Sequence, residues 1–312
     1  RSGLPFRCAA PATSSQLTGL SSMSPKFLTG LAGIAADYDA FLLDLWGVVH
    51  NGHTPYPGVL ECMANLRENG KPLILVSNAP RTNDHVIAFL CNIGVERTDY
   101  DKILTSGDIT REVLTRREHP FLKDTGKAFY QIGAVRDKGL EDGLGYTRVH
   151  SVEAADFLIC TGLVDDETET PEDYRSLLME GLSRDLPMLC ANPDLMVMRG
   201  TTIHYCAGAI AALYAELGGR VELFGKPYPE VYRQAIEKLG VKASRILAVG
   251  DSMRTDIKGA HVAGIDSVLV SGGIHAEEWG LRAGQVPTKD QVNAVTEQYG
   301  IVPNYVIGHM VW

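Results

Sequence analysis

The 312-residue sequence lacks several features that would place it in a specialised class of protein. No stretch approaches the roughly 20 consecutive apolar residues that a membrane-spanning helix needs. No run of basic residues offers a surface for a phosphate backbone, and the net charge of −9 also disfavours a nucleic-acid partner. Six cysteines occur without CxxC or zinc-type spacing, which favours reduced thiols over a disulfide framework. These absences indicate a globular protein with no membrane span.

Acidic residues are also missing from residues 1–36, which are rich in Ser, Thr and Ala and contain Arg1, Arg7 and Lys26. This composition is typical of organellar targeting segments, so we expect an N-terminal arm and a mitochondrial location. A plastid or the cytoplasm is the alternative location. A plain disordered tail would have the same composition.

Short apolar strands alternate with amphipathic helices from Asp39 onward. Strands are predicted over 40–44 and 72–77, with helices over 57–69 and 83–93. This βαβ alternation predicts an α/β fold with a Rossmann-like parallel sheet.

The same pattern returns after Gly219, with strands over 221–224, 245–251 and 267–270 and a helix over 229–239. We therefore expect a core made of residues 37–107 and 206–312. The segment 108–205 has strands and helices of its own, which predicts an inserted α/β cap domain.

Polar side chains follow the predicted core strands. Residues at the carboxyl ends of parallel strands line one crevice, so Asp44, Ser77 and Asp251 should converge. Two carboxylates in one cluster repel each other unless a cation lies between them, and Mg²⁺ prefers such hard oxygen ligands. Asp44 and Asp251 are therefore the candidate metal ligands.

A pocket for a phosphoryl group is predicted beside this cluster. Ser77 and Asn78 end a strand before a helix, where a hydroxyl and free backbone N–H groups can hold an anionic oxygen. Lys226 adds a positive charge on another loop that precedes a helix. Asp256 lies five residues after Asp251 and can orient either the metal's water shell or Lys226.

Four motifs have now been described, and they are centred on Asp44, on Ser77, on Lys226, and on Asp251 with Asp256. Their order and spacing resemble the haloacid dehalogenase-like (HAD) hydrolase superfamily, specifically its NagD-like group with a large α/β cap. The resemblance covers about residues 37–275 and extends to the following segments: Ala79-Pro80-Arg81, Thr105-Ser106-Gly107, Ala191-Asn192-Pro193-Asp194 and Gly272-Gly273-Ile274-His275.

The resemblance implies a covalent mechanism that depends on Mg²⁺. In it, Asp44 attacks phosphorus to form an aspartyl-phosphate, and Mg²⁺ is held by Asp44, the backbone carbonyl of Trp46, and Asp251. Ser77 and Lys226 hold the phosphoryl oxygens. Asp194, at the end of the cap segment, is a candidate for substrate contact, with a turn role after Pro193 as the alternative.

The sequence departs from the family pattern at Trp46. Phosphatases of the superfamily carry a second Asp two residues after the nucleophile, which protonates the leaving oxygen and later activates water. Losing a positioned acid typically lowers the rate by about 10²–10⁴. His50, six residues after Asp44, is a candidate substitute because imidazole titrates near neutrality, and a structural histidine is the alternative.

We therefore expect a Mg²⁺-dependent, phosphatase-like hydrolase that acts on a small phosphorylated substrate, slowly if nothing replaces the missing acid. The alternative is a catalytically weak or silent HAD domain that serves as an accessory subunit of an organellar assembly, attached through its N-terminal arm. A homodimer is the alternative to membership of a larger assembly. A haloacid dehalogenase would also lack the second Asp, but Lys226 and Asp251 favour phosphate.

Overall fold

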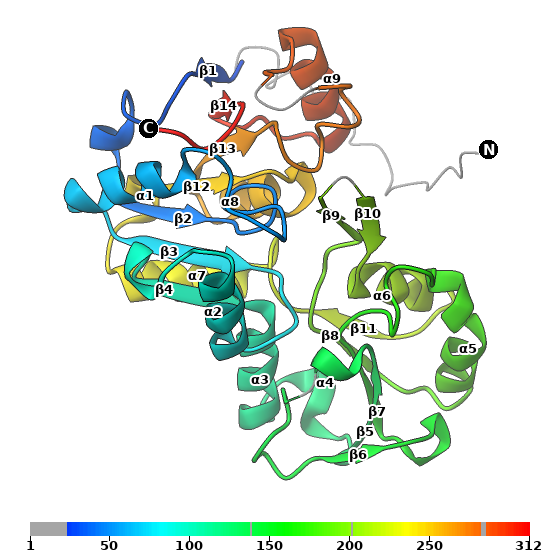
Figure 1. The fold of residues 1–312 in the computed structure, drawn as a ribbon. Coiled ribbons are helices and arrows are strands. Elements are labelled where there is room, and N and C mark those ends of the chain that lie inside the picture. Colours follow the sequence, from blue (N-terminus) through cyan, green and yellow to red (C-terminus); the bar gives the residue numbers. More distant parts are fainter. Residues whose placement is uncertain (1–23, 138, 201, 282–284) are drawn as a thin grey trace.

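The computed structural model describes residues 24–137, 139–200, 202–281 and 285–312. Within this part of the chain, two parallel sheets form two units, which Figure 1 shows as a core in blue, yellow and red and a smaller unit in green. The core sheet has seven strands, in this order: β1 (Lys26–Leu28), β14 (Tyr305–Ile307), β13 (Asp266–Val270), β12 (Ile246–Gly250), β2 (Ala40–Leu43), β3 (Leu73–Ser77) and β4 (Lys102–Thr105).

Alternation along the central strands explains the layers of the core. Phe41 and Leu43 of β2 point to one face, and Ala40 and Leu42 point to the other. Both faces are apolar, as expected for a sheet covered by helices on each side. The first face packs against α1 (Val59–Glu68) and α2 (Asn83–Asn92), and the second against α7 (Pro229–Leu239) and α8 (Lys258–Val262).

Other helical segments complete the core. α9 (Lys289–Tyr299) packs with residues of β13 and β14, and a π-helical turn (Met253–Ile257) leads into α8. Short 3₁₀ turns lie at Ala35–Asp37, Arg97–Asp99 and Ala243–Arg245. Among the described residues, none of the helices combines the length and apolar character needed to cross a membrane.

The smaller unit, which we call the cap, is built on a five-stranded parallel sheet. Its strands have the order β11 (Val221–Leu223), β8 (Met188–Cys190), β7 (Phe157–Cys160), β5 (Ala128–Ile132) and β6 (Thr147–Val149). Helices α5 (Arg175–Ser183) and α6 (Ala207–Glu216) cover one face, and α3 (Ser106–Arg116) and α4 (Pro120–Lys123) cover the other.

A hairpin and several short turns complete the cap. An antiparallel hairpin of β9 (Met196–Arg199) and β10 (Thr202–Tyr205) extends from the cap toward the core, as Figure 1 shows. Three short 3₁₀ turns complete the cap, at Val135–Asp137, Val152–Ala154 and Pro171–Tyr174.

The predicted return to the core at residue 206 is wrong. β11 pairs with β8, with Val221 opposite Met188, and α6 packs into the cap's apolar cluster. The chain therefore leaves the cap only after Leu223. A strand of the cap and a strand of the core have the same apolar pattern, so the residues of this strand do not indicate which sheet will accept it.

The predicted arm over 1–36 is also too long. Residues 1–23 lie outside the described residues, but Lys26–Leu28 form an edge strand that pairs in parallel with Tyr305–Ile307. Leu31 is fully buried in the core. The chain from Lys26 onward therefore belongs to the core, because a late strand, β14, gives it a partner that its own composition does not reveal.

Candidate active site

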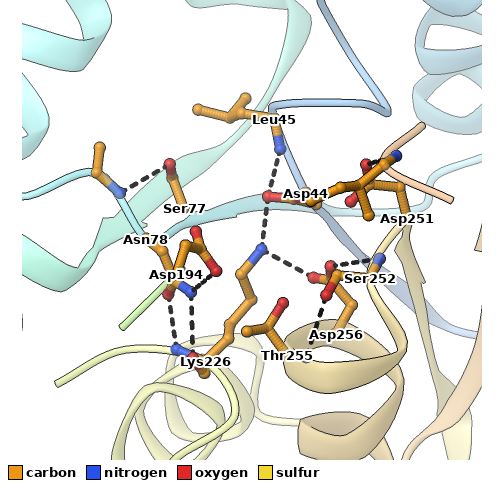
Figure 2. Close-up of polar contacts among 12 residues, drawn as sticks. Asp44, Leu45, Ser77, Asn78, Asp194, Lys226, Asp251, Ser252, Thr255 and Asp256 are labelled. Carbon is orange, nitrogen blue, oxygen red and sulfur yellow. Dashed lines mark hydrogen bonds and ion pairs between the residues drawn. The ribbon is translucent and has the colours of Figure 1, made fainter. Parts of the chain in front are cut away.

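Three carboxylates meet at the carboxyl ends of the core strands. Asp44 directly follows β2, Asp251 directly follows β12, and Asp256 lies in the π-helical turn after β12. One ligand atom from each lies within 4.8 Å of the others. Figure 2 shows their side chains gathered around the Lys226 ammonium group and the loop after β12.

Lys226 joins two of these carboxylates. Its Nζ atom lies 2.5 Å from Asp44 Oδ1 and 2.8 Å from Asp256 Oδ1, and the Lys226 side chain is only 4% exposed. The backbone N–H of Leu45 donates a second hydrogen bond to Asp44 Oδ1 at 2.7 Å. Asp251 Oδ2 accepts from the Ile274 N–H at 2.7 Å. One ammonium therefore pairs with two of the three carboxylates.

Burial and mutual repulsion shift the protonation of this cluster. Burial, with the nearby Asp256 charge, raises the pKa of Asp44 to about 8, although Lys226 opposes the shift. Burial and the charges of Asp44 and Asp256 likewise raise the pKa of Asp251. Burial by itself would lower the pKa of Lys226, but the facing carboxylates raise it well above its usual value. The cluster therefore holds protons more readily than free carboxylates do, and a bound cation would replace those protons and relieve the repulsion.

The donor set fits a hard divalent cation such as Mg²⁺. All three clustered acidic side chains offer oxygen, and Asp251 forms no ion pair with any described residue. Gly47 also leaves space beside Asp251, because a Cβ atom there would lie 1.9 Å from Asp251 Oδ2. Its φ of +78° is a second reason for glycine at this position.

Ser77 ends β3 and Asn78 follows it, and the two side chains differ in their contacts. The Ser77 hydroxyl accepts from the Ala79 N–H at 3.2 Å and lines the crevice. The Asn78 amide accepts from the Lys226 N–H at 2.7 Å and donates to the Lys226 carbonyl and to Asp194. Asn78, which we predicted to bind phosphate, therefore uses its side chain to position the Lys226 backbone and Asp194.

Asp194 lies between the core and the cap. Besides its 3.0 Å hydrogen bond from Asn78, it lies 3.7 Å from an Arg254 nitrogen, and Arg254 also donates to the Pro193 carbonyl. Arg254 was not singled out from the sequence, although it stands between Asp251 and Asp256 in the same motif. Its position between two candidate site residues is the sequence feature that could have indicated a role for Arg254 in the site.

Trp46 lines the crevice, whereas His50 is buried behind it. Their rings contact each other with centroids 4.8 Å apart, and both rings also contact Phe89. His50 Nδ1 accepts from the Gly52 N–H at 3.0 Å, and burial lowers the pKa of His50 to about 4. His50 is absent from the residues that line the crevice. The structure thus supports the structural alternative for His50 over the acid role.

Two cavities meet at the cluster and share the residues Asp44, Trp46, Asp194 and Val197. The first, about 240 Å³, runs past Asp251 and the hairpin residues Met196, Met198 and Ile203. The second, about 140 Å³, runs past Ser77 toward the carboxyl ends of the cap strands. The sequence did not predict these cap walls, because their residues come from segments that only the fold brings together.

Comparisons with known proteins agree with this geometry. A family model described as haloacid dehalogenase-like hydrolase matches residues 41–147, and one described as HAD-hydrolase-like matches residues 223–298. The solved structure of a haloacid dehalogenase-like family hydrolase from Brucella suis 1330 is 37% identical, with a TM-score of 0.78, and the match covers 91% of this chain and all of that one (100%). The chain belongs to the haloacid dehalogenase-like hydrolase family. The predicted α/β fold with a HAD core and cap is confirmed.

Other HAD relatives have names that describe their activity. The ribonucleotide monophosphatase NagD of Escherichia coli (strain K12) is 27% identical over 237 residues, which are 75% of this chain and 87% of that protein. A glycerol phosphate phosphatase from Mycobacterium tuberculosis, solved in complex with calcium, is 25% identical with a TM-score of 0.59 and coverage of 77% of this chain and 68% of that one. The predicted NagD-like membership is therefore confirmed.

Proposed function

We propose that this HAD protein is a Mg²⁺-dependent phosphatase that hydrolyses a small phosphorylated substrate through an aspartyl-phosphate at Asp44. The observation that carries the proposal is the Lys226 ammonium between Asp44 and Asp256, with Asp251 beside them. A cluster of buried acids is costly to a fold, so its presence favours a chemical role. The phosphatase names of the NagD and glycerol phosphate relatives support the same reaction class.

The proposed reaction has two displacements at phosphorus. A carboxylate oxygen of Asp44 attacks phosphorus, and the ester P–O bond breaks with its electron pair on the leaving oxygen. Water then attacks phosphorus in the aspartyl-phosphate, and the bond between phosphorus and the Asp44 oxygen breaks with its electron pair on that oxygen. The attacking water loses a proton to solvent, inorganic phosphate leaves, and the Asp44 carboxylate is restored. Lys226 and Ser77 would hold the phosphoryl oxygens, and Asp256 keeps the Lys226 ammonium in place.

Asp44, Asp251 and the Trp46 backbone carbonyl would hold the metal. Bound Mg²⁺ would neutralise negative charge on the transferred phosphoryl group.

Trp46 sets the expected substrate preference of the reaction. Its side chain cannot protonate a leaving oxygen, and His50, buried and held neutral, is not in the crevice. Esters with acidic leaving groups, such as aryl or acyl phosphates, need this proton least. We therefore expect such esters to turn over faster than alkyl phosphates.

The test is hydrolysis of 4-nitrophenyl phosphate with Mg²⁺, compared with the same assay in excess chelator. Asp44→Asn should abolish the metal-dependent rate. Asp39→Asn is the matched control, because Asp39 lies just before β2, at the opposite end from Asp44, and pairs with Arg245 on the surface. Equal rates for the wild-type and Asp44→Asn proteins would overturn the proposal.

Trp46 also favours a second candidate, a silent HAD domain that acts as an accessory subunit of an organellar assembly. In that case no phosphate ester would turn over, and the native protein would migrate with a large complex. Turnover by a purified monomer or homodimer would exclude this candidate.

A further inference from the structure

Three charged side chains of the cap converge in the wall of the second cavity. Arg136 follows β5, Asp166 lies in the loop after β7, and Arg199 ends β9. An Nη2 atom of each arginine lies 2.8 Å from Asp166 Oδ2. We call these three residues the arginine cluster.

The arginine cluster carries an excess of positive charge. Burial would raise the pKa of Asp166, but the hydrogen bond from Arg199 and the charges of both arginines lower it below its usual value. Asp166 is therefore ionised, and one arginine would be enough to neutralise it. The neighbouring pair of Arg81 and Asp137, 2.6 Å apart in the same cavity wall, is balanced by contrast.

The arginines also have hydrogen-bond donors to spare. Among the described residues, Arg136 donates only through Nη2, to Asp166, and its side chain is 49% exposed. A guanidinium has five N–H donors in a planar fork that matches a carboxylate or a phosphate. The remaining donors of Arg136 are thus available to a ligand in the cavity.

The arginine cluster lines the same cavity as the proposed nucleophile, Asp44. The second cavity is lined by Asp44 and Ser77 on the core side and by Arg136 and Arg199 on the cap side. A molecule that fills it with its phosphoryl group at Asp44 therefore also lies against the arginines.

We propose that the arginine cluster binds a second anionic group of the substrate, a carboxylate or a second phosphate, at the end opposite the phosphoryl group that reacts. This inference rests on the proposed phosphatase function. It assigns the substrate to the class of phosphate esters that carry another negative charge.

The test compares three aryl esters in the presence of Mg²⁺: 4-carboxyphenyl phosphate, 1,4-phenylene bisphosphate and the uncharged analogue 4-carbamoylphenyl phosphate. Arg136→Gln should lower kcat/KM for one or both charged esters about tenfold or more relative to the carbamoyl ester, since a charge-assisted hydrogen bond is lost. A loss confined to one charged ester tells which group the cluster binds.

Arg175→Gln is the matched control. Arg175 lies in α5 of the cap, pairs with Glu172 and has a side chain that is 47% exposed, close to the value for Arg136. It should leave the ratios between esters unchanged. The proposal is overturned if Arg136→Gln changes all three esters by the same factor.

A binding measurement separates this inference from the proposed function. Calorimetry with the Asp44→Asn protein would compare the Kd of the charged and uncharged esters, with and without Arg136→Gln. If no ester turns over but the charged ester binds more tightly and loses that advantage in Arg136→Gln, the phosphatase proposal fails and the anion site stands. If all esters turn over and no ratio changes, the anion site fails alone.

Discussion

The core and the cap both place charged side chains in the crevice, but those of the core are buried and those of the cap are more exposed. Both sheets are parallel, and loops after strands of both sheets line the crevice. On the core side the Asp44 and Lys226 side chains are 10% and 4% exposed, whereas on the cap side Arg136 is 49% exposed. Burial makes the core charges depend on one another, because each would be costly alone.

The difference separates chemistry from selection. Charges that are buried and coupled stay in one arrangement, which suits a group that must attack phosphorus in a fixed geometry. Charges at a partly exposed rim contribute less to stability than buried ones and can differ between relatives without loss of the fold. We therefore expect changes on the core side to alter rate and stability strongly, and changes on the cap side to alter mainly the choice of substrate.

Of the changes proposed on the two sides of the crevice, replacing Trp46 by Asp should have the largest effect on the rate of hydrolysis. A carboxylic acid two residues after Asp44 would supply the missing proton to the leaving oxygen. We expect kcat/KM for an alkyl phosphate to rise by about 10²–10⁴-fold, measured by phosphate release with Mg²⁺. The gain should be much smaller for 4-nitrophenyl phosphate, whose leaving group hardly needs a proton.

Trp46→Asn is the matched control, since its amide has nearly the shape of the carboxyl group but cannot act as the acid. A similar gain in Trp46→Asn would show that removing the indole ring, and not adding an acid, accelerates the reaction. No gain in either variant would contradict the role we give to position 46.

Replacing Lys226 by Met tests how strongly the buried core charges depend on one another. The change leaves Asp44 and Asp256 without their shared partner, which should lower the free energy of unfolding by about 3–5 kcal/mol. Urea unfolding at pH 7.5 in chelator, followed by tryptophan fluorescence, measures this. All three tryptophans, Trp46, Trp279 and Trp312, lie outside the cap strands and report on the core.

The double change of Lys226→Met with Asp256→Asn should recover part of that loss, because one unpaired charge is removed. A loss below about 1 kcal/mol for Lys226→Met alone would place the pair with ordinary surface ion pairs and remove the contrast between core and cap.

The same contrast explains what the sequence could predict. Asp44, Ser77 and Asp251 each end or follow an apolar strand, so strand pattern and strand-end chemistry alone indicated that they would lie together. The fold class followed from the βαβ alternation. These features are local in the sequence, and each motif carries its own signal.

The remaining features depend on long-range pairing. β11 joins the cap because β8 accepts it in register, and Lys26–Leu28 joins the core because β14 lies at the sheet edge. The arginine cluster combines three separate cap segments around Asp166, and no single segment has a motif. The use of Asn78 to hold Lys226 could not be foreseen either, because its partner lies 148 residues away.

His50 provides a pH-dependent test of charge burial on the core side. Burial lowers its pKa to about 4 in the folded protein, whereas the unfolded chain should titrate near 6.5. The unfolded state therefore binds more protons between these values, and stability is lost as the pH falls from about 6.5 to about 4. The loss from this group reaches roughly 3 kcal/mol at the acidic end.

His50→Asn removes the titrating group and keeps a hydrogen-bond acceptor for the Gly52 N–H. The stability of this variant relative to the wild-type protein should improve steadily as the pH is lowered, in unfolding experiments at pH 7, 6, 5 and 4. His53→Asn, in the exposed loop nearby, is the matched control for removing a histidine from this part of the chain. Parallel pH profiles for His50→Asn and the wild-type protein would contradict the assignment.

Replacing Arg136 by Gln should have the smallest effect on stability. Asp166 keeps Arg199 as a partner at 2.8 Å, and the lost pair involves a side chain that is half exposed. The free energy of unfolding should fall by no more than about 1 kcal/mol, in the same urea experiment used for Lys226→Met. Because the cap strands contain no tryptophan, far-UV circular dichroism must accompany fluorescence to detect a separate transition of the cap. A loss as large as that of Lys226→Met would mean that the arginine cluster holds the cap together, and the division between a chemical core side and a selective cap side would not hold.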